Sequence, residues 1–314
     1  MSIDVGQAHC QITPDRPLPL AGQMRERIPE YTRDPLTANA VALSADGLRV
    51  VIVSCDLLGV RDNVRDPVQQ ACAERYGIDG RHVLIAATHT HVGPATWTSR
   101  IVCQHDDAYV NTLIDRLIGL IGEALDDLEP CRLHAGRGWM DHMGWNRRGL
   151  HHSPHGVQAD MYHGSWNEDF IGPEGPRDGD VPVIFARRIV DNADEGPMTR
   201  ADGPVKAIIT GFATHPNCLE QGHFFSADLV GETRRVVRAA LGEDVGFVYL
   251  TGAAGNTAPS IMENNPDNRQ PWRYEAGVLR SGQYLGGEVL RVIGAAVDPI
   301  ADPTFRLAQR ELTL

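Results

Sequence analysis

The sequence predicts an α/β fold in which a mixed, partly parallel sheet is flanked by helices in a layered sandwich. Four short apolar runs, rich in β-branched residues and bounded by polar residues or glycine, are typical of buried strands. Segments between and after them repeat apolar residues at a spacing of about 3.6, the period of an amphipathic helix. This alternation of strand and helix favours a sheet covered by helices.

The first group of elements lies in residues 48–125. Strands are expected at Leu48–Ser54 and His82–Ala87, because both are short apolar runs. Each is followed by a helical pattern, the first over Asp66–Tyr76 and the second over Asp107–Leu125. In the longer helix, leucine and isoleucine recur on one side, so that side is expected to pack on the sheet.

The second group repeats this order nearer the C-terminus. Strands are expected at Val205–Phe212 and Val245–Leu250, and helices at Ala227–Leu241 and Ser281–Val297. The chain shows no internal repeat and no linker between independent units. We therefore predict a single domain over residues 1–314.

Between the two groups, residues 139–180 are rich in Gly, His and Trp and have no sustained periodicity. A connection of about 40 residues exceeds the usual length, so we predict a functional loop or lid. Its histidines either bind a second metal or grip a substrate, or they belong to a solvated loop, and the sequence leaves these alternatives open. They are His142, His151, His152, His155 and His163.

The composition excludes several classes of protein. With 29 basic and 41 acidic residues the formal charge is -12, which gives no electrostatic footprint for nucleic acid. Lys206 is the only lysine, so a phosphate-binding loop of the GxxxxGK type is absent. The six cysteines form no CxxC pair and are expected to be buried, reduced thiols. Without a signal-like N-terminus or an apolar run of about 18 residues, we expect a cytoplasmic protein with no integral membrane segment, unless a leader was removed.

Polar residues follow all four predicted strands, where an open α/β sheet binds its ligands. His89 and His91 lie two residues apart, so in an extended chain both side chains point to the same face. His215 follows another strand and adds a third imidazole. Three protein ligands and an open water position are typical of catalytic zinc, and Asp56 and Asp228 are the nearest oxygen donors.

Several motifs together resemble the neutral/alkaline non-lysosomal ceramidase family. The most specific is ATHTHVGP at residues 87–94, which looks like the family's ATHTHSGP signature. Other segments resemble the family's elements in the same order along nearly the whole chain. They are Gly6–Pro14, Asn146–Arg148, Phe212–Asn217, Ser226–Gly231 and Gly252–Pro259, of which the SADxxG segment resembles short bacterial relatives.

The resemblance implies a zinc-dependent hydrolase that cleaves an amide (C–N) bond of a small-molecule or lipid-like substrate by metal-activated water. One zinc ion per chain is expected, with His89 and His215 as the family's ligands and Asp228 as a further candidate. His91, Arg147 and Asn256 are then expected to be catalytic. Substrate binding is assigned to Arg147, Gly255 and Asn146, and backbone N–H groups of the glycine-rich loop are expected to stabilise an oxyanion.

Two departures from the family keep alternatives open. Ala258 stands where the family's loop carries a serine implicated as nucleophile, and Asn256 stands where that loop carries an acidic residue. The family's remaining zinc ligands, a Glu and a Tyr, come from segments beyond Leu314, so we expect this domain to lack the family's C-terminal part. The alternatives are an amidohydrolase-type metal barrel and a catalytically impaired binding protein. The sequence does not indicate the oligomeric state.

Overall fold

The computed structural model describes residues 3–98, 104–190, 202–301 and 305–310, and its centre is an eight-stranded mixed sheet. The strand order is β14-β12-β11-β6-β1-β3-β4-β5. The pairs β4–β5 and β12–β14 are parallel and the other neighbours are antiparallel, which confirms the predicted mixed sheet. The strands are β1 (Ile3–Gln11), β3 (Thr37–Ala45), β4 (Leu48–Cys55), β5 (Val83–Ala87), β6 (Glu129–Trp139), β11 (Asp180–Ile189), β12 (Asp202–Phe212) and β14 (Gly246–Thr251).

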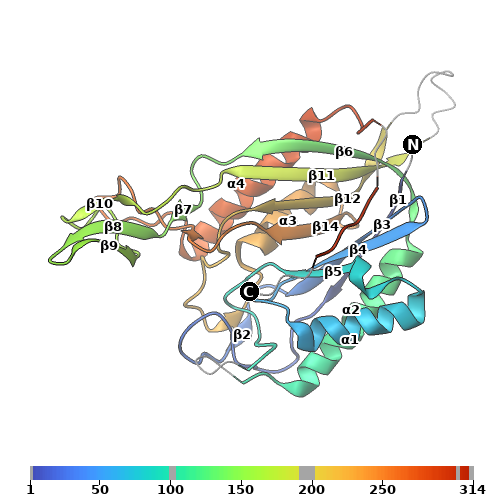
Figure 1. Ribbon diagram of the computed structural model, residues 1–314, viewed down its shortest axis with the longest axis horizontal. Coiled ribbons are helices and arrows are strands. Elements are labelled where there is room, and N and C mark those ends of the chain that lie inside the picture. Colours follow the sequence, from blue (N-terminus) through green and yellow to red (C-terminus); the bar gives the residue numbers. More distant parts are fainter. Residues whose placement is uncertain (1–2, 99–103, 191–201, 302–304, 311–314) are drawn as a thin grey trace.

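The sheet folds over so that its two halves face each other. β14, at one end of the strand order, contacts β3 and β4 near the other end. The Ser54 hydroxyl on β4 donates to the backbone carbonyl of Tyr249 on β14, at 2.8 Å. Helices cover the outer face of each half, which gives the layered sandwich seen in Figure 1. The α-helices of the described residues are α1 (Asp62–Tyr76), α2 (Asp107–Asp126), α3 (Asp228–Leu241) and α4 (Tyr274–Ala295).

Three apolar clusters hold these layers together. One lies between α1, α2 and the first half of the sheet and includes Leu117 and Val53. A second lies between α3, α4 and the other half and includes Phe247. The third lies between the two halves of the sheet, with Val248 among its buried residues. Strands that face apolar layers on both sides need continuous apolar sequence, which explains the uninterrupted runs.

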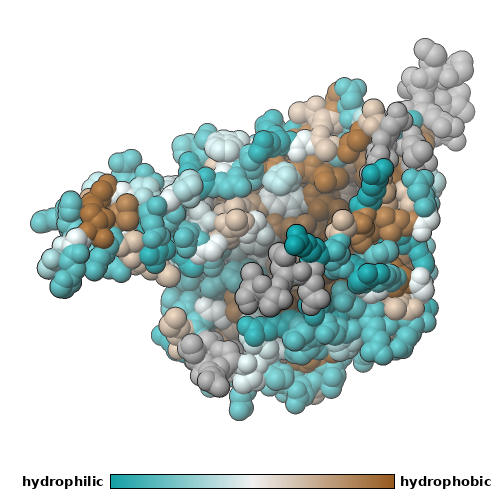
Figure 2. All heavy atoms as spheres, in the orientation of Figure 1, coloured by the Kyte–Doolittle hydropathy of each residue, from teal (hydrophilic) through white to brown (hydrophobic). Residues whose placement is uncertain are grey.

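Between the halves, an apolar cleft of about 500 Å³ opens at one side of the molecule and is seen as brown patches in Figure 2. Phe305 packs against the third cluster, between the two halves of the sheet, at this cleft.

The last helix begins at Tyr274, earlier than the predicted start at Ser281. The sequence did not show this start, because the first turns carry polar and glycine residues that hide the periodicity. No helix in the described part of the chain has the length and apolarity needed to span a membrane.

Residues 139–180 connect β6 to β11, and the prediction of a loop without regular structure is wrong for their local structure. They form a short three-stranded sheet, ordered β10-β8-β9, which projects from the body of the molecule as a lobe (Figure 1). These strands carry few apolar residues on either face, so they leave no period-two signal in the sequence. The short strands are β7 (Trp145–Asn146), β8 (Arg148–Ser153), β9 (Gly156–Met161) and β10 (Phe170–Pro173).

The remaining short elements join loops near the strand ends. β7 pairs with β15 (Thr257–Ala258), β2 (Tyr31–Thr32) pairs with β13 (Phe224–Phe225), and the short helix η1 (Gly80–His82) precedes β5. In the described residues the main sheet has two parallel pairs among largely antiparallel neighbours. An amidohydrolase-type barrel of eight parallel strands is therefore excluded as the fold of this part of the chain.

Candidate metal centre

Three histidines from two loops converge at the ends of the parallel strand pairs. His89 and His91 follow β5, and His215 follows β12. The ring centroids of His89 lie 5.2 Å from His91 and 4.9 Å from His215, and those of His91 and His215 lie 5.5 Å apart. One ring nitrogen from each lies within 4.8 Å of the others, so the three imidazoles are close enough to share one ion.

His89 reaches this cluster by an unusual backbone conformation. Its φ is 71°, in the left-handed region that non-glycine residues rarely adopt. The prediction that His89 and His91 lie close together is confirmed, since both side chains are in the cluster. The prediction that the chain is extended there is wrong. The amide of His89 donates to Leu57 O at 2.9 Å, which helps to hold this strained residue in place.

Hydrogen bonds to backbone carbonyls set the tautomers of two of the rings. Nδ1 of His89 donates to Leu58 O at 2.7 Å. Nδ1 of His215 donates to Ala254 O at 2.6 Å and lies 3.0 Å from Thr257 O. The Nε2 lone pairs of both rings are thus left free, which is the arrangement that metal-ligating histidines usually have.

His91 differs from the other two because neither ring nitrogen has a hydrogen-bond partner among the described residues, although the side chain is buried. Burial lowers the pKa of His89 and holds the pKa of His91 well below its usual value, where the neighbouring histidines add to the effect. Burial, together with the charge of Arg147, lowers the pKa of His215 to about 4. All three rings are therefore neutral near pH 7, the form that binds a metal.

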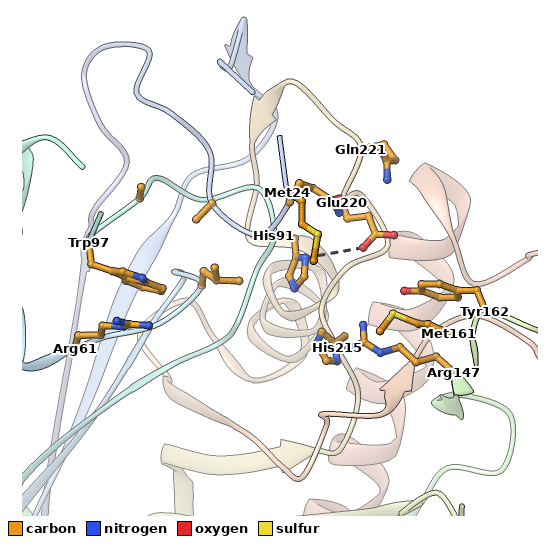
Figure 3. Close-up of a pocket in the computed structure, with 15 residues that line it drawn as sticks. Met24, Arg61, His91, Trp97, Arg147, Met161, Tyr162, His215, Glu220 and Gln221 are labelled. Carbon is orange, nitrogen blue, oxygen red and sulfur yellow. Dashed lines mark ion pairs between the residues drawn. The ribbon is translucent and has the colours of Figure 1, made fainter. Parts of the chain in front are cut away.

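Two of the three histidines, His91 and His215, border a pocket of about 560 Å³, shown in Figure 3. His91 and His215 lie at its centre, with Arg147 and Tyr162 on one side and Trp97 and Arg61 opposite. The pocket therefore combines histidine ring nitrogens, two guanidinium groups and apolar side chains. Such a combination is typical of a small-molecule binding site.

Glu220 is a pocket residue that the sequence did not single out. Its Oε2 lies 3.9 Å from Nδ1 of His91 and accepts a 2.8 Å hydrogen bond from Asn217 Nδ2. Its other carboxylate oxygen pairs with Arg273. A single glutamate in an irregular loop belongs to no sequence motif or periodic pattern. Only the three-dimensional structure shows that it lies beside His91.

Arg27 is a second residue that sequence reasoning missed. Its guanidinium is buried and donates to the backbone carbonyls of His91 at 2.6 Å, Ala21 at 2.9 Å and Gly222 at 2.9 Å. It thereby ties three loops together behind the histidine cluster. An isolated arginine in a polar N-terminal segment carries no sequence signal for this role.

Arg147 lies in the pocket, as the sequence predicted, and the glycine-rich loop holds it there. Its Nη2 donates to Gly255 O at 2.9 Å and its amide donates to Asn256 O at 2.7 Å. The loop therefore presents carbonyl oxygens to Arg147 and His215, contrary to the expected cradle of N–H groups. The Asn256 residue is exposed, and the Asn146 side chain is buried and accepts from Arg148 N at 3.0 Å, so neither side chain lines the pocket.

The structure does not bring the predicted oxygen ligands to the histidines. The Asp228 carboxylate is fully buried and accepts from the amides of Leu219 and Leu229 at 2.9 and 2.7 Å, which pins the loop to the start of α3. Asp56 is paired with Arg234 at 2.6 Å. The assignment of Asp228 as a metal ligand is therefore wrong, because its oxygens are used by the backbone away from the cluster.

The protein is therefore an α/β protein with a cluster of three histidines beside a pocket, at the carboxyl ends of its parallel strands. Many metal-dependent enzymes belong to this class. Residues 33–155 match the family model described as neutral/alkaline non-lysosomal ceramidase, N-terminal. This match confirms the resemblance that the motifs indicated, over the part of the chain that it covers.

Proteins named as ceramidases are similar to this chain over part of their own length. Neutral ceramidase of Pseudomonas aeruginosa is 27% identical over 241 residues, which are 74% of this chain and 32% of that protein. The crystal structure of neutral ceramidase from Pseudomonas aeruginosa superposes with a TM-score of 0.76 at 20% identity, over 96% of this chain and 46% of that one. A structure described as ceramidase complexed with C2 gives a TM-score of 0.73 at 20% identity, over 96% and 45%. The chain thus spans about a third to a half of these relatives.

Proposed function

We propose that this chain is a zinc-dependent hydrolase that cleaves an amide bond of a small, lipid-like substrate. The observation that carries the proposal is the cluster of three neutral imidazoles, with His91 buried and without a hydrogen-bond partner among the described residues. A buried polar group without a partner is costly, so its position is best explained by a ligand that the fold is built to receive. The relatives named as ceramidases support the amide class.

The residues present fit a zinc ion well. His89 and His215 would hold it through Nε2, since their Nδ1 atoms are fixed by backbone carbonyls. A zinc ion in this place would polarise the amide carbonyl and make water a stronger nucleophile near neutral pH. Glu220 and His91 lie beside these two ligands and remain free to take part in proton transfer.

The chain's own residues would then perform three tasks. The Arg147 guanidinium, held by Gly255 O, would bind the substrate carbonyl oxygen and stabilise the negative charge that develops there. The free lone pair of His91 would accept a proton from water, and the nearby Glu220 carboxylate would stabilise the imidazolium that results. Trp97 and Met161 would contact the apolar part of the substrate.

Direct attack by water suits this chain because its loop offers no nucleophilic hydroxyl at the histidines. Ala258, at the position of the family's serine, is fully buried in β15. Ser260 lines a neighbouring cavity together with Tyr162 and Glu220, and it does not line the histidine pocket. Neither residue is therefore assigned a role in attack on the substrate.

The test is zinc content and hydrolysis measured on the same preparations. Zinc-loaded wild type is expected to hydrolyse one or more members of a panel of N-acyl amides that includes ceramides with short acyl chains. His89→Ala and His215→Ala are each expected to lose the ion from this site and to lower kcat/KM at least about 100-fold. His142→Ala, which changes an exposed histidine, serves as the matched control.

Retention of zinc at this site in both variants would contradict the metal assignment. If zinc-loaded wild type turned over no amide or ester of the panel, while longer relatives were active in it, the alternative of a catalytically impaired binding protein would be favoured.

A further inference from the structure

The lobe formed by β8, β9 and β10 lacks an apolar core. None of the three apolar clusters in the described chain includes a residue between 144 and 180. Val157, Met161 and Ile171 are instead 59%, 52% and 46% exposed, and Figure 2 shows the lobe as largely hydrophilic with one hydrophobic patch. So small a unit usually needs a metal or a disulfide, and residues 139–180 contain no cysteine.

Two histidines stack where a core would otherwise lie. His151 is on the central strand β8 and is 8% exposed. The loop after β9 crosses this strand at Gly149, where a Cβ atom would lie 1.7 Å from the backbone oxygen of His163, so only glycine permits the approach. The rings of His151 and His163 are consequently stacked, with centroids 4.3 Å apart.

Carboxylates surround this histidine pair. Nε2 of His151 lies 2.9 Å from Asp160 Oδ2, and its Nδ1 lies 3.4 Å from Asp169 Oδ2. Nε2 of His163 lies 2.7 Å from the other oxygen of Asp169. The carboxylates give the site negative charge, and one ligand atom each from His151, His163 and Asp169 lies within 4.8 Å of the others.

Oxygen atoms face both ring nitrogens of His151. Nε2 lies 2.9 Å from Asp160 Oδ2, and Nδ1 lies 3.3 Å from His152 O and 3.4 Å from Asp169 Oδ2. Two of these oxygens belong to carboxylates, so their charge attracts a cation to this place.

We propose that His151, His163 and Asp169 form a structural metal site for a zinc-like divalent ion, separate from the histidine pocket. Two ligands of a tetrahedral zinc ion with bonds of about 2.0–2.2 Å lie about 3.3 Å apart, close to the separation of His151 Nδ1 and Asp169. Asp160 then orients His151 through its Nε2–H, as carboxylates do beside metal-ligating histidines.

The ion links the lobe to the pocket. Tyr162, directly before His163, lines the pocket together with Met161 and donates its amide to Arg147 O at 2.5 Å. Fixing His163 therefore fixes one wall of the pocket. The proposed metal site nevertheless uses residues of the lobe alone, so it can be tested separately from the proposed hydrolysis.

The test counts zinc in the double variant His89→Ala/His215→Ala, in which the pocket ligands are removed. After chelation and titration with zinc, this protein is expected to bind one ion per chain. Adding His151→Ala or His163→Ala is expected to abolish that binding, whereas adding His152→Ala, an exposed neighbour on the same strand, leaves it unchanged. Asp160→Asn is expected to weaken it about 10- to 100-fold.

Hydrogen exchange of the wild type provides a readout that needs no variant. Zinc is expected to slow amide exchange in residues 148–173 relative to the chelated protein. The proposal is overturned if the double variant binds no zinc, if His163→Ala leaves its binding unchanged, or if zinc does not alter exchange in the lobe. A double variant that binds two ions would instead contradict the pocket assignment and leave the lobe site intact.

Discussion

The depressed pKa of His215 predicts a loss of stability in acid that a single substitution removes. In the chelated protein the His215 pKa is about 4, against 6.5 for an ordinary imidazole, because the ring is buried beside Arg147. As the pH falls below 6.5 the unfolded chain binds a proton at this histidine and the folded chain does not, so the free energy of unfolding decreases until the pH reaches about 4. At about 1.4 kcal/mol per pKa unit, the whole decrease is about 3 kcal/mol, of which about 2 kcal/mol is lost by pH 5.

The assay is urea denaturation of chelated wild type and His215→Gln between pH 7 and pH 5. Glutamine keeps an N–H donor for the carbonyls of Ala254 and Thr257 but cannot take up a proton. The difference in unfolding free energy between the two proteins is expected to change by about 2 kcal/mol over this range, with the wild type losing more. If the two stability curves run parallel, the account of a buried, neutral His215 is refuted.

Three further substitutions separate catalysis, packing and charge pairing. Glu220→Gln is expected to lower kcat about 10-fold or more with little change in KM, because it removes the carboxylate beside His91 and keeps the shape of the side chain. Unchanged steady-state kinetics would contradict this role. Phe247→Ala is expected to cost about 3–5 kcal/mol in urea denaturation, since the ring is fully buried in the core under α3 and α4, and a cost below about 1 kcal/mol would count against that packing. Asp56→Ala is expected to lower the free energy of unfolding by about 3–5 kcal/mol, because it leaves the charge of Arg234 buried without this partner. The zinc content is expected to stay the same, and loss of zinc would instead support Asp56 as a ligand.

The grouping of the histidines at the strand ends was predictable, because polar residues that follow buried strands meet at one edge of a sheet. That reasoning brought His89 and His215 together from positions far apart in the chain. It failed for Asp228, because a carboxylate at the start of a helix has the same sequence signature whether it binds a metal or backbone amides. Only the contacts of its two oxygens distinguish the two roles.

Glu220, Arg27 and the lobe were not predictable from local patterns. Glu220 and Arg27 act through contacts between loops that no periodicity specifies. The strands of the lobe are joined by backbone pairing and by histidine–carboxylate contacts, so they lack the alternating apolar residues by which a strand is recognised. Folding of the sheet into two facing halves is likewise a long-range property, set by contacts of β14 with β3 and β4.

The central claim is that the pocket histidines hold a metal ion, and anomalous diffraction at the zinc edge from zinc-replete wild-type crystals tests it most directly. We expect a strong peak about 2.0–2.1 Å from Nε2 of both His89 and His215, with Nδ1 of each still bonded to its backbone carbonyl. Crystals that show no peak among His89, His91 and His215 would contradict the account.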